Sequence, residues 1–547
     1  MTESLTSIPE KPLAGTAARI GWAVLILATL YICYFSHLGA IGFVGPDEPR
    51  YAWIARDMAE TRDWVTPRLY GKPWFEKPPL FYWGAAICFK VFGVSETAAR
   101  LPSAISALLA TLALGWLAAR LYGEETARWL LLLLPTSVGM IGFSHAAATD
   151  MPFSGMLTIA MVCAAVILGL TRNENSPILP RTPWLALILF GFFLGLAVLA
   201  KGPAAIILSG GAVFFWALFT KRWRDALRLF HPAAIAAFCL TALPWYILCA
   251  RRNPDFIRVF IIEHNFKRFL TPEFQHIQPF WFYAPVLLVA LLPWTFSFAR
   301  IAGGTGRSSR LDDWLSSPSL FFICWALFPV LFFSLSKSKL PGYILPAIPP
   351  MGLLMAQNVS LRLRKILPGD RWIRITSGVT FILLGIFGML QVERTPLEWP
   401  ALAIGIGGFT ILFLRDLRLG LAIGVGAVVF AIASSLTGNT REVLDGRYSA
   451  RSAPQAARIV WNNYSPERTS TYKLTRSFQY GLNFYFHREL PEWLPGRPPG
   501  WVFAPASEER ELRDQGLNCP LNTFRHAVIV CNDADLPAGG PSSGQPQ

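Results

Sequence analysis

Long apolar runs recur along the chain from about residue 20 to residue 436, separated by short polar and basic stretches. Most are close to the roughly 20 residues that a helix needs to cross a bilayer. We therefore predict a polytopic α-helical membrane protein with about thirteen transmembrane helices. Their approximate ranges are 20–38, 100–119, 128–147, 152–171, 183–200, 203–220, 232–250, 280–299, 318–336, 341–358, 374–391, 399–414 and 417–436. No signal-peptide cleavage site follows the first run, so we expect it to remain as an anchor.

One apolar segment, 79–93, is too short to cross the membrane and is interrupted by Lys90. We interpret it as an interfacial or re-entrant helix. With a cytoplasmic N-terminus, every loop predicted on the inner side is then basic, for example 221–228 and 362–365, as the positive-inside rule requires. Counting 79–93 as a span would break this alternation. The C-terminus is therefore predicted to lie outside.

The composition changes near residue 440. Residues 1–440 are predicted to form the transmembrane domain, with a first external loop at about 39–99. Residues 441–547 are predicted to form a small external α/β domain that ends in a disordered tail. Within it, alternation and β-branched content predict strands in 470–486 and 526–532. Cys519 and Cys531 can form a disulfide there if this region faces an oxidising compartment.

The composition agrees with a membrane protein and argues against other classes. Of the 547 residues, 53% are hydrophobic and 15% are charged, compared with about 25% charged in soluble domains. The net charge of +15 comes from cations scattered through the loops, so we expect no nucleic-acid binding. No P-loop, GxSxG or HExxH motif is present.

The first external loop contains two adjacent carboxylates, Asp47 and Glu48, between Pro46 and Pro49. A short, rigid turn of this kind suits a fixed general acid or base. The alternative is an ordinary helix start, with Asp47 as the N-cap and Glu48 in the first turn.

Glu76 and Lys77 lie in the same loop, before a double proline that favours extended backbone. Lys77 and Arg50 together can bind a phosphate, one as a point charge and the other as a planar fork. The alternative for such cations is that they reach toward lipid headgroups.

Other charged residues are predicted on the same external side. Asp150 stands at the start of a helix, where an N-cap role is the alternative, and Lys201 at the end of one. Lys337 and Lys339 flank an outward helix end, against the positive-inside bias, and look like ligands for an anionic lipid head or a substrate phosphate.

The external loop 251–279 contains Glu263, His264 and Arg268 in a stretch with helical character. An interfacial amphipathic helix explains this stretch, because Glu263 and Lys267 are an i,i+4 pair. A single histidine near a carboxylate is weak evidence for a metal site, since no spacing motif supports it.

The stretches "PDEPRYAWIARDM", "DWVTPRLYGKPWFEKPPLFYW", "ATDMP", "AKGP" and "SKSKLPGYILP" occur in this order and topology. They resemble the bacterial 4-amino-4-deoxy-L-arabinose transferase (ArnT) family of GT-C glycosyltransferases, a group that includes protein O-mannosyltransferases. The resemblance implies a GT-C fold, an undecaprenyl-phosphate-linked sugar as donor, and an active site on the periplasmic face of the bacterial inner membrane.

The resemblance also implies roles for individual residues. Asp47 matches the catalytic acid of the first loop. We predict that the lipid phosphate and the sugar are bound by Arg50, Tyr51, Glu76, Lys77, Asp150, Lys201, Arg268, Lys337, Lys339 and Tyr343. Glu76 and His264 are the candidate ligands if a divalent cation takes part; no cofactor is otherwise implied. Trp74 stands where the family often has a tyrosine.

Two mechanisms remain open for Asp47. With a hydroxyl acceptor it acts as a general base and the sugar carbon is inverted. With a lipid A phosphate as acceptor no base is needed, and Asp47 positions the acceptor or the sugar amine. Lipid A is the first expected acceptor, and a protein or another glycan the second. A protein O-mannosyltransferase-like enzyme is one alternative function. A secondary transporter or lipid flippase is another, although its charges should lie near the bilayer midplane.

Overall fold

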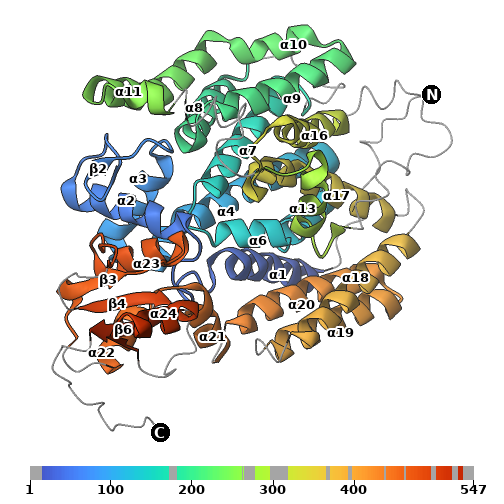
Figure 1. The fold of residues 1–547 in the computed structure, drawn as a ribbon. Coiled ribbons are helices and arrows are strands. Elements are labelled where there is room, and N and C mark those ends of the chain that lie inside the picture. Colours follow the sequence, from blue (N-terminus) through green and yellow to red (C-terminus); the bar gives the residue numbers. More distant parts are fainter. Residues whose placement is uncertain are drawn as a thin grey trace, which may run out of the picture.

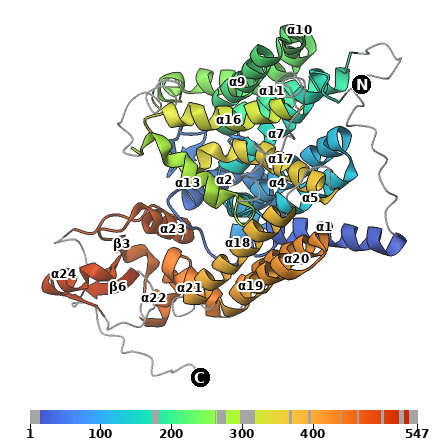
Figure 2. The same cartoon turned by 90° about the vertical axis from the view of Figure 1, so that its right-hand side faces the viewer.

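The computed structural model describes residues 15–171, 182–260, 263, 277–295, 318–364, 370–391, 397–436, 439–460, 464–494, 500–519 and 528–533. The chain forms a large helical body with a small sheet domain against one end of it (Figures 1 and 2). The first half of the helical body comprises α1 (Thr16–Phe35), α2 (Asp47–Thr61), α3 (Leu80–Phe92), α4 (Glu96–Tyr122), α5 (Glu124–Leu133), α6 (Val138–Ser144), α7 (Asp150–Ile167), α8 (Trp184–Lys201), α9 (Ala204–Thr220), α10 (Trp223–Leu227) and α11 (Pro232–Arg252). The second half comprises α13 (Tyr283–Ala290), α16 (Ser319–Leu335), the 3-10 turn η4 (Pro341–Ala347), α17 (Ile348–Leu363), α18 (Asp370–Leu390), α19 (Glu398–Phe413) and α20 (Leu417–Ser435).

The polytopic helical fold is confirmed, but the number of thirteen spans is not. Among the described residues, eight helices are long and apolar enough to cross a membrane, or nine if the bent pair α5–α6 forms one span. At four predicted ranges the described helices α9, α13, α16 and α19 have fewer than 18 residues. The segment predicted to be too short to cross is α3, a 13-residue helix that packs between α2 and α4.

Helix α7 lies at the centre of the helical body. Almost all of its residues are buried, because apolar side chains cover its whole circumference. Helices α4 and α8 and the turn η4 pack around it. Since α7 and α8 run antiparallel, the first residue of α7, Asp150, meets the last residue of α8, Lys201, at one end of the body.

The C-terminal region contains α21 (Asn439–Tyr448), α22 (Ala453–Val460), α23 (Arg476–Phe486), α24 (Glu509–Asp514) and a four-stranded sheet. The strands are β3 (Thr469–Thr471), β4 (Trp501–Pro505), β5 (Leu517–Asn518) and β6 (Val528–Asp533), in the order β3-β4-β6-β5. Only the β3–β4 pair is parallel. The predicted strand at 526–532 corresponds to β6, and Cys519 and Cys531 form a disulfide.

The strand predicted over 470–486 is wrong beyond β3, because Arg476–Phe486 forms helix α23. Phe478, Leu482 and Phe486 recur at helical spacing and pack on the domain core beside β4. Phe484 lies on another face of the helix and packs on the cluster around α2 and α3. The helix lies between two cores and therefore needs apolar side chains on two sides. With apolar residues on two sides, the sequence does not show the single apolar face, repeated every 3.6 residues, by which a helix is recognised.

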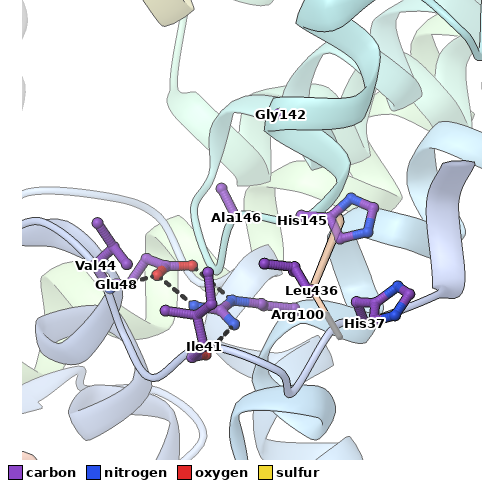
Figure 3. Close-up of a pocket in the computed structure, with 9 residues that line it drawn as sticks. All are labelled: His37, Ile41, Val44, Glu48, Arg100, Gly142, His145, Ala146 and Leu436. Atoms are coloured by element: carbon purple, nitrogen blue, oxygen red, sulfur yellow. Dashed lines mark hydrogen bonds and ion pairs between the residues drawn. The ribbon is translucent and has the colours of Figure 1, made fainter. Parts of the chain in front are cut away.

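The loop before α2 is held by a buried ion pair between Glu48 and Arg100 of α4 (Figure 3). The Nε and Nη2 atoms of Arg100 donate to the two carboxylate oxygens of Glu48 at 2.9 and 2.7 Å. The guanidinium also donates to three backbone carbonyls, those of Leu38, Ile41 and Gly42. Glu48 in turn accepts from the backbone N–H groups of Val44 and Ala147. This network joins the segment after α1, the start of α2, α4 and the turn before α7.

A cavity of 340 Å³ lies beside this pair, lined by His37, Ile41, Val44, Gly142, His145, Ala146 and Leu436 as well as Glu48 and Arg100. Figure 3 shows Glu48 and Arg100 facing each other at one side of it and the two histidines at the other. His145 is tied to both neighbouring segments, since its ring nitrogens lie 2.9 Å from the carbonyl oxygen of Ile141 and 2.8 Å from that of Ser36. The cavity is therefore part of the join between α1 and α6.

Replacing the carboxylate of this pair is expected to destabilise the protein. Glu48→Gln leaves the Arg100 guanidinium buried without its counter-charge, a change that typically costs about 3–5 kcal/mol. We expect a clearly lower thermal unfolding midpoint in detergent, followed by tryptophan fluorescence. The control is Glu124→Gln, whose carboxylate is 65% exposed and pairs with Arg128, and which should cost less than about 1 kcal/mol. Equal midpoints for the two variants would contradict the assigned role of Glu48.

Candidate functional site

The first charged group of the site comes from the first turn of α2. Pro46 precedes the helix, and the structure shows no side-chain cap there, so Asp47 is a first-turn residue and not the N-cap. Asp47 and Arg50 are three residues apart and lie on one face of the helix, where they form an ion pair. Glu48 lies one residue on and points instead to Arg100. Helix geometry thus gives the two adjacent carboxylates different partners.

The hairpin β1 (Arg68–Leu69) and β2 (Lys72–Pro73) leads the chain back to this helix. It brings Glu76 to 3.1 Å from the Nη2 atom of Arg50. The ammonium of Lys77 lies 3.7 Å from the other carboxylate oxygen of Glu76. The side chains of Arg50, Glu76 and Lys77 are all 11–13% exposed. Two cations and two carboxylates therefore form one cluster in the segment that connects α1 and α4.

Asp47 is the most accessible member of this cluster, with 51% of its side chain exposed. On the side facing the cluster it is enclosed by protein, and this desolvation raises the pKa of its carboxyl group. The positive charges of Arg50 and Lys77 oppose the increase, whereas the negative charges of Glu76 and Asp150 add to it. The contribution of Asp150 to this pKa shift indicates that the start of α7 lies close to the cluster.

Asp150 and Lys201 form the second part of the site. Their side chains make a close ion pair where the start of α7 meets the end of α8. The Lys201 ammonium lies 4.8 Å from the ring centre of Tyr343, which belongs to η4. Gly342 leaves room for this pair, because a methyl group at its Cα would lie 2.9 Å from the carboxyl carbon of Asp150.

Two buried N–H groups at the cluster have no hydrogen-bond partner among the described residues. One is the Nε–H of Arg50 and the other is the indole N–H of Trp74. The ring centre of Trp74 lies 5.5 Å from the guanidinium carbon. Buried donors of this kind are costly unless a ligand or water accepts from them. The site can therefore accept an anionic or oxygen-rich group.

The other predicted ligands have different surroundings. Tyr51 is 2% exposed, packs on Phe81 and Tyr82, and has its ring 5.3 Å from the Arg50 guanidinium carbon. Lys339 is buried, and its ammonium donates to the backbone carbonyls of Ser336 and Gln278. Tyr51 thus supports Arg50, and Lys339 braces the connection between α16 and η4. Lys337 is exposed.

Arg268 and His264 lie outside the described residues, so the structure does not place these two predicted ligands. Glu76, the other candidate metal ligand, is engaged by Arg50 and Lys77. In the described part of the chain, no group of three or more His, Cys, Asp and Glu side chains has the arrangement of a metal site. The cluster as described is an ion-pair network suited to an anion.

A second cavity, of 540 Å³, opens beside Glu76. Its walls are Pro73–Glu76 on one side and, on the other, Arg252–Asp255 with Arg258 and Val259. Arg252 pairs with Asp63, and Arg258 with Asp255. The cavity is thus large enough for a sugar-sized group and adjoins the charged cluster.

Sequence reasoning missed two residues that support the site, Arg100 and Tyr480. Arg100 is the first residue of the predicted span 100–119, and a cation at the end of a span next to an acidic loop is a signal that was available. Tyr480 of α23 has its ring 5.7 Å from the Arg50 guanidinium carbon. No local signal marks Tyr480, because about 430 residues separate it from Arg50 and only the fold brings them together.

A family model and individual relatives both relate this chain to glycosyltransferases. Residues 21–260 match the model of the dolichyl-phosphate-mannose-protein mannosyltransferase family. The chain is 33% identical over 412 residues to the undecaprenyl phosphate-α-4-amino-4-deoxy-L-arabinose arabinosyl transferase of Serratia proteamaculans, covering 72% of this chain and 70% of the relative. The corresponding enzyme of Erwinia tasmaniensis is 35% identical over 314 residues, covering 57% of this chain and only 55% of the relative's length.

Solved structures agree on the fold. The crystal structure of ArnT from Cupriavidus metallidurans bound to undecaprenyl phosphate superposes with a TM-score of 0.74 at 23% identity, covering 95% of this chain and 99% of that one. Its apo state gives a TM-score of 0.73. The GT-C fold predicted from the sequence is thereby confirmed. The chain belongs to the undecaprenyl phosphate-α-4-amino-4-deoxy-L-arabinose arabinosyl transferase (ArnT) family.

Proposed function

We propose that this chain is an integral-membrane glycosyltransferase. It transfers a sugar, with 4-amino-4-deoxy-L-arabinose as the first candidate and another pentose or hexose as the second, from undecaprenyl phosphate to an acceptor. The observation that carries the proposal is Arg50, whose buried Nε–H lacks a partner among the described residues while Lys77 and Trp74 lie beside it. A lipid phosphate supplies the oxygens that these donors need. Relatives named for this donor support its identity.

Transfer requires an acceptor oxygen to attack the anomeric carbon while the bond from that carbon to the phosphate oxygen breaks. The phosphate departs with the bonding electrons, and Arg50 and Lys77 stabilise its growing charge. A hydroxyl acceptor loses its proton to Asp47, whose partly exposed carboxylate faces incoming groups. Attack opposite the leaving group inverts the sugar carbon. If the acceptor is an anionic phosphate, Asp47 instead positions the acceptor or the sugar amine.

We place the reaction on the periplasmic side of the bacterial inner membrane, with lipid A as the first acceptor and a protein or another glycan as the second. The Cys519–Cys531 disulfide supports an oxidising compartment for the C-terminal domain, which residues 441–547 form in this proposal. Helix α2, which begins with Asp47, and this domain lie side by side at the same end of the helical body (Figure 1). Ion pairs gathered at one end also suit this function better than transport, which places charges near the midplane.

The test of the proposal is Asp47→Asn in membranes supplied with the undecaprenyl-phosphate-linked aminosugar and lipid A. Removing a general base typically lowers the rate about 10²- to 10⁴-fold, and mass spectrometry of lipid A measures the transfer. Asp57→Asn is the matched control, because it makes the same change on the same helix but lies among Asp63, Glu60 and Arg68. Full activity of Asp47→Asn would refute its role, and no transfer by the wild type would refute this combination of donor and acceptor.

The pH dependence of transfer follows from the raised pKa of Asp47. A general base works only when deprotonated, so the rate should fall with decreasing pH through this pKa. Because burial raises the pKa, the fall should occur above the ordinary aspartate value of about 3.9. Initial rates from pH 4 to pH 8, roughly the span around the expected pKa, measure it. A flat profile down to the ordinary aspartate value would favour a positioning role for Asp47.

Gly342→Ala tests the second ion pair. The added methyl group meets Asp150 and should displace it from Lys201, so we expect roughly a tenfold or greater loss of transfer. Gly210→Ala is the control, because no atom lies within 4 Å of a methyl group at that helical position. Unchanged activity in Gly342→Ala would show that Asp150 and Lys201 act outside the reaction.

A further inference from the structure

The C-terminal domain places an aromatic ring beside Arg50, the central residue of the proposed phosphate site. Helix α23 packs against α2, and Figures 1 and 2 both show it between α2 and the sheet. The ring centre of Tyr480 lies 5.7 Å from the guanidinium carbon of Arg50. Tyr480 is half-buried, so its ring is available to both the protein and the site.

Arg50 is surrounded by three aromatic rings. Those of Tyr51 and Trp74 come from the first external loop, at 5.3 and 5.5 Å from the guanidinium carbon, and that of Tyr480 comes from the C-terminal domain. Aromatic faces attract a guanidinium within about 6 Å and orient it without accepting its N–H groups as carboxylates do. Rings can therefore fix Arg50 and still leave its donors for a ligand.

The other contacts of Arg50 do not fix it in the same way. Both of its carboxylate partners, Asp47 and Glu76, meet the same nitrogen, Nη2. The Nε atom is buried without a partner among the described residues. The ion pairs therefore hold the guanidinium at Nη2. The three rings are the contacts that restrict how the rest of the guanidinium plane can turn.

The position of Tyr480 is well defined because α23 is attached to the first external loop along its length. Asn483 donates to the hydroxyl of Tyr70 at 3.0 Å. The Tyr485 hydroxyl donates to Glu96 at 2.8 Å and accepts from the backbone N–H of Phe43. After the helix, the ring nitrogen Nε2 of His487 lies 3.1 Å from a carboxylate oxygen of Glu60.

We propose that Tyr480 is a positioning residue for the reaction: from the C-terminal domain, its ring holds the Arg50 guanidinium in the orientation that binds the donor phosphate. The site is therefore completed only when this domain is docked on the first external loop. The inference rests on the proposed function for the identity of the anion. The placement of Tyr480 over Arg50 does not depend on it.

The test is binding of undecaprenyl phosphate to the purified full-length protein in detergent, followed by tryptophan fluorescence. Tyr480→Phe keeps the ring and removes the hydroxyl, so it should bind as the wild type does. Tyr480→Leu keeps the bulk and removes the ring, so it should bind roughly 3- to 10-fold more weakly. Equal binding by the Leu variant and the wild type would overturn the proposal. An equal loss in both variants would overturn it too, because the hydroxyl would then be responsible.

A double-mutant cycle separates positioning from mere stabilisation. In an Arg50→Gln background, Tyr480→Leu should change binding less than about 2-fold, because its effect acts through Arg50. An undiminished effect in that background would contradict the proposal. Tyr485→Phe, which removes two docking hydrogen bonds without facing Arg50, reports the effect of loosened docking. Thermal unfolding of each variant confirms that it is folded.

The two proposals fail in distinguishable ways. If wild-type protein binds undecaprenyl phosphate but transfers no sugar to lipid A, the donor site and Tyr480 remain testable while the acceptor assignment fails. If the wild type does not bind undecaprenyl phosphate, the donor assignment and the role of Tyr480 both fail. If transfer and binding are intact and the Leu variant matches the wild type, only the role of Tyr480 fails.

Discussion

The buried pair of Glu48 and Arg100 is the interaction on which the rest of the site depends. Each of the guanidinium N–H groups has an acceptor, and each carboxylate oxygen has two donors. An ion pair so fully hydrogen-bonded avoids most of the desolvation cost that makes buried charges unfavourable. It attaches the loop before α2 to α4 and to the turn before α7. The start of α2 therefore has a fixed position relative to the membrane-embedded helices.

That fixed position gives two neighbouring carboxylates different tasks. Glu48 points inward, and both of its carboxylate oxygens are bound in the structural pair with Arg100. Asp47 points toward Arg50, and its side chain remains half exposed. The second ion pair, Asp150 with Lys201, is held by the antiparallel packing of α7 and α8. Two independent parts of the fold thus bring opposite charges close together, and the Nε–H of Arg50 and the indole N–H of Trp74, which lack a partner among the described residues, suit an anionic group. Because these charges lie on helices and not on a flexible loop, their positions are fixed before a substrate binds.

The C-terminal domain contributes to the same arrangement. Its helix α23 has one apolar face for its own core and another for the cluster around α2. A helix shared by two cores fixes their relative position, so the domain packs directly on α2 and the segment around it. Asp445 and Arg451 extend this contact to the segment after α1, through the backbone N–H of Gly42 and the carbonyls of Gly39 and Ala40. The site is accordingly built at the junction of two regions.

The sequence by itself determined the helical membrane fold, and it predicted most of the charged residues that the structure brings together, Asp47, Arg50, Glu76 and Lys77 in one cluster and Asp150 and Lys201 in an ion pair. These features are local, because apolar run length and the residue types within a motif depend on few neighbours. It did not determine the number of full spans, the helical state of α23 or the separate roles of Asp47 and Glu48. Tertiary structure decided these, as well as the places of Arg100 and Tyr480. The reason is physical. The partner of a buried charge, as Arg100 is for Glu48, and the second core on which a helix such as α23 packs come from residues that are distant in the chain.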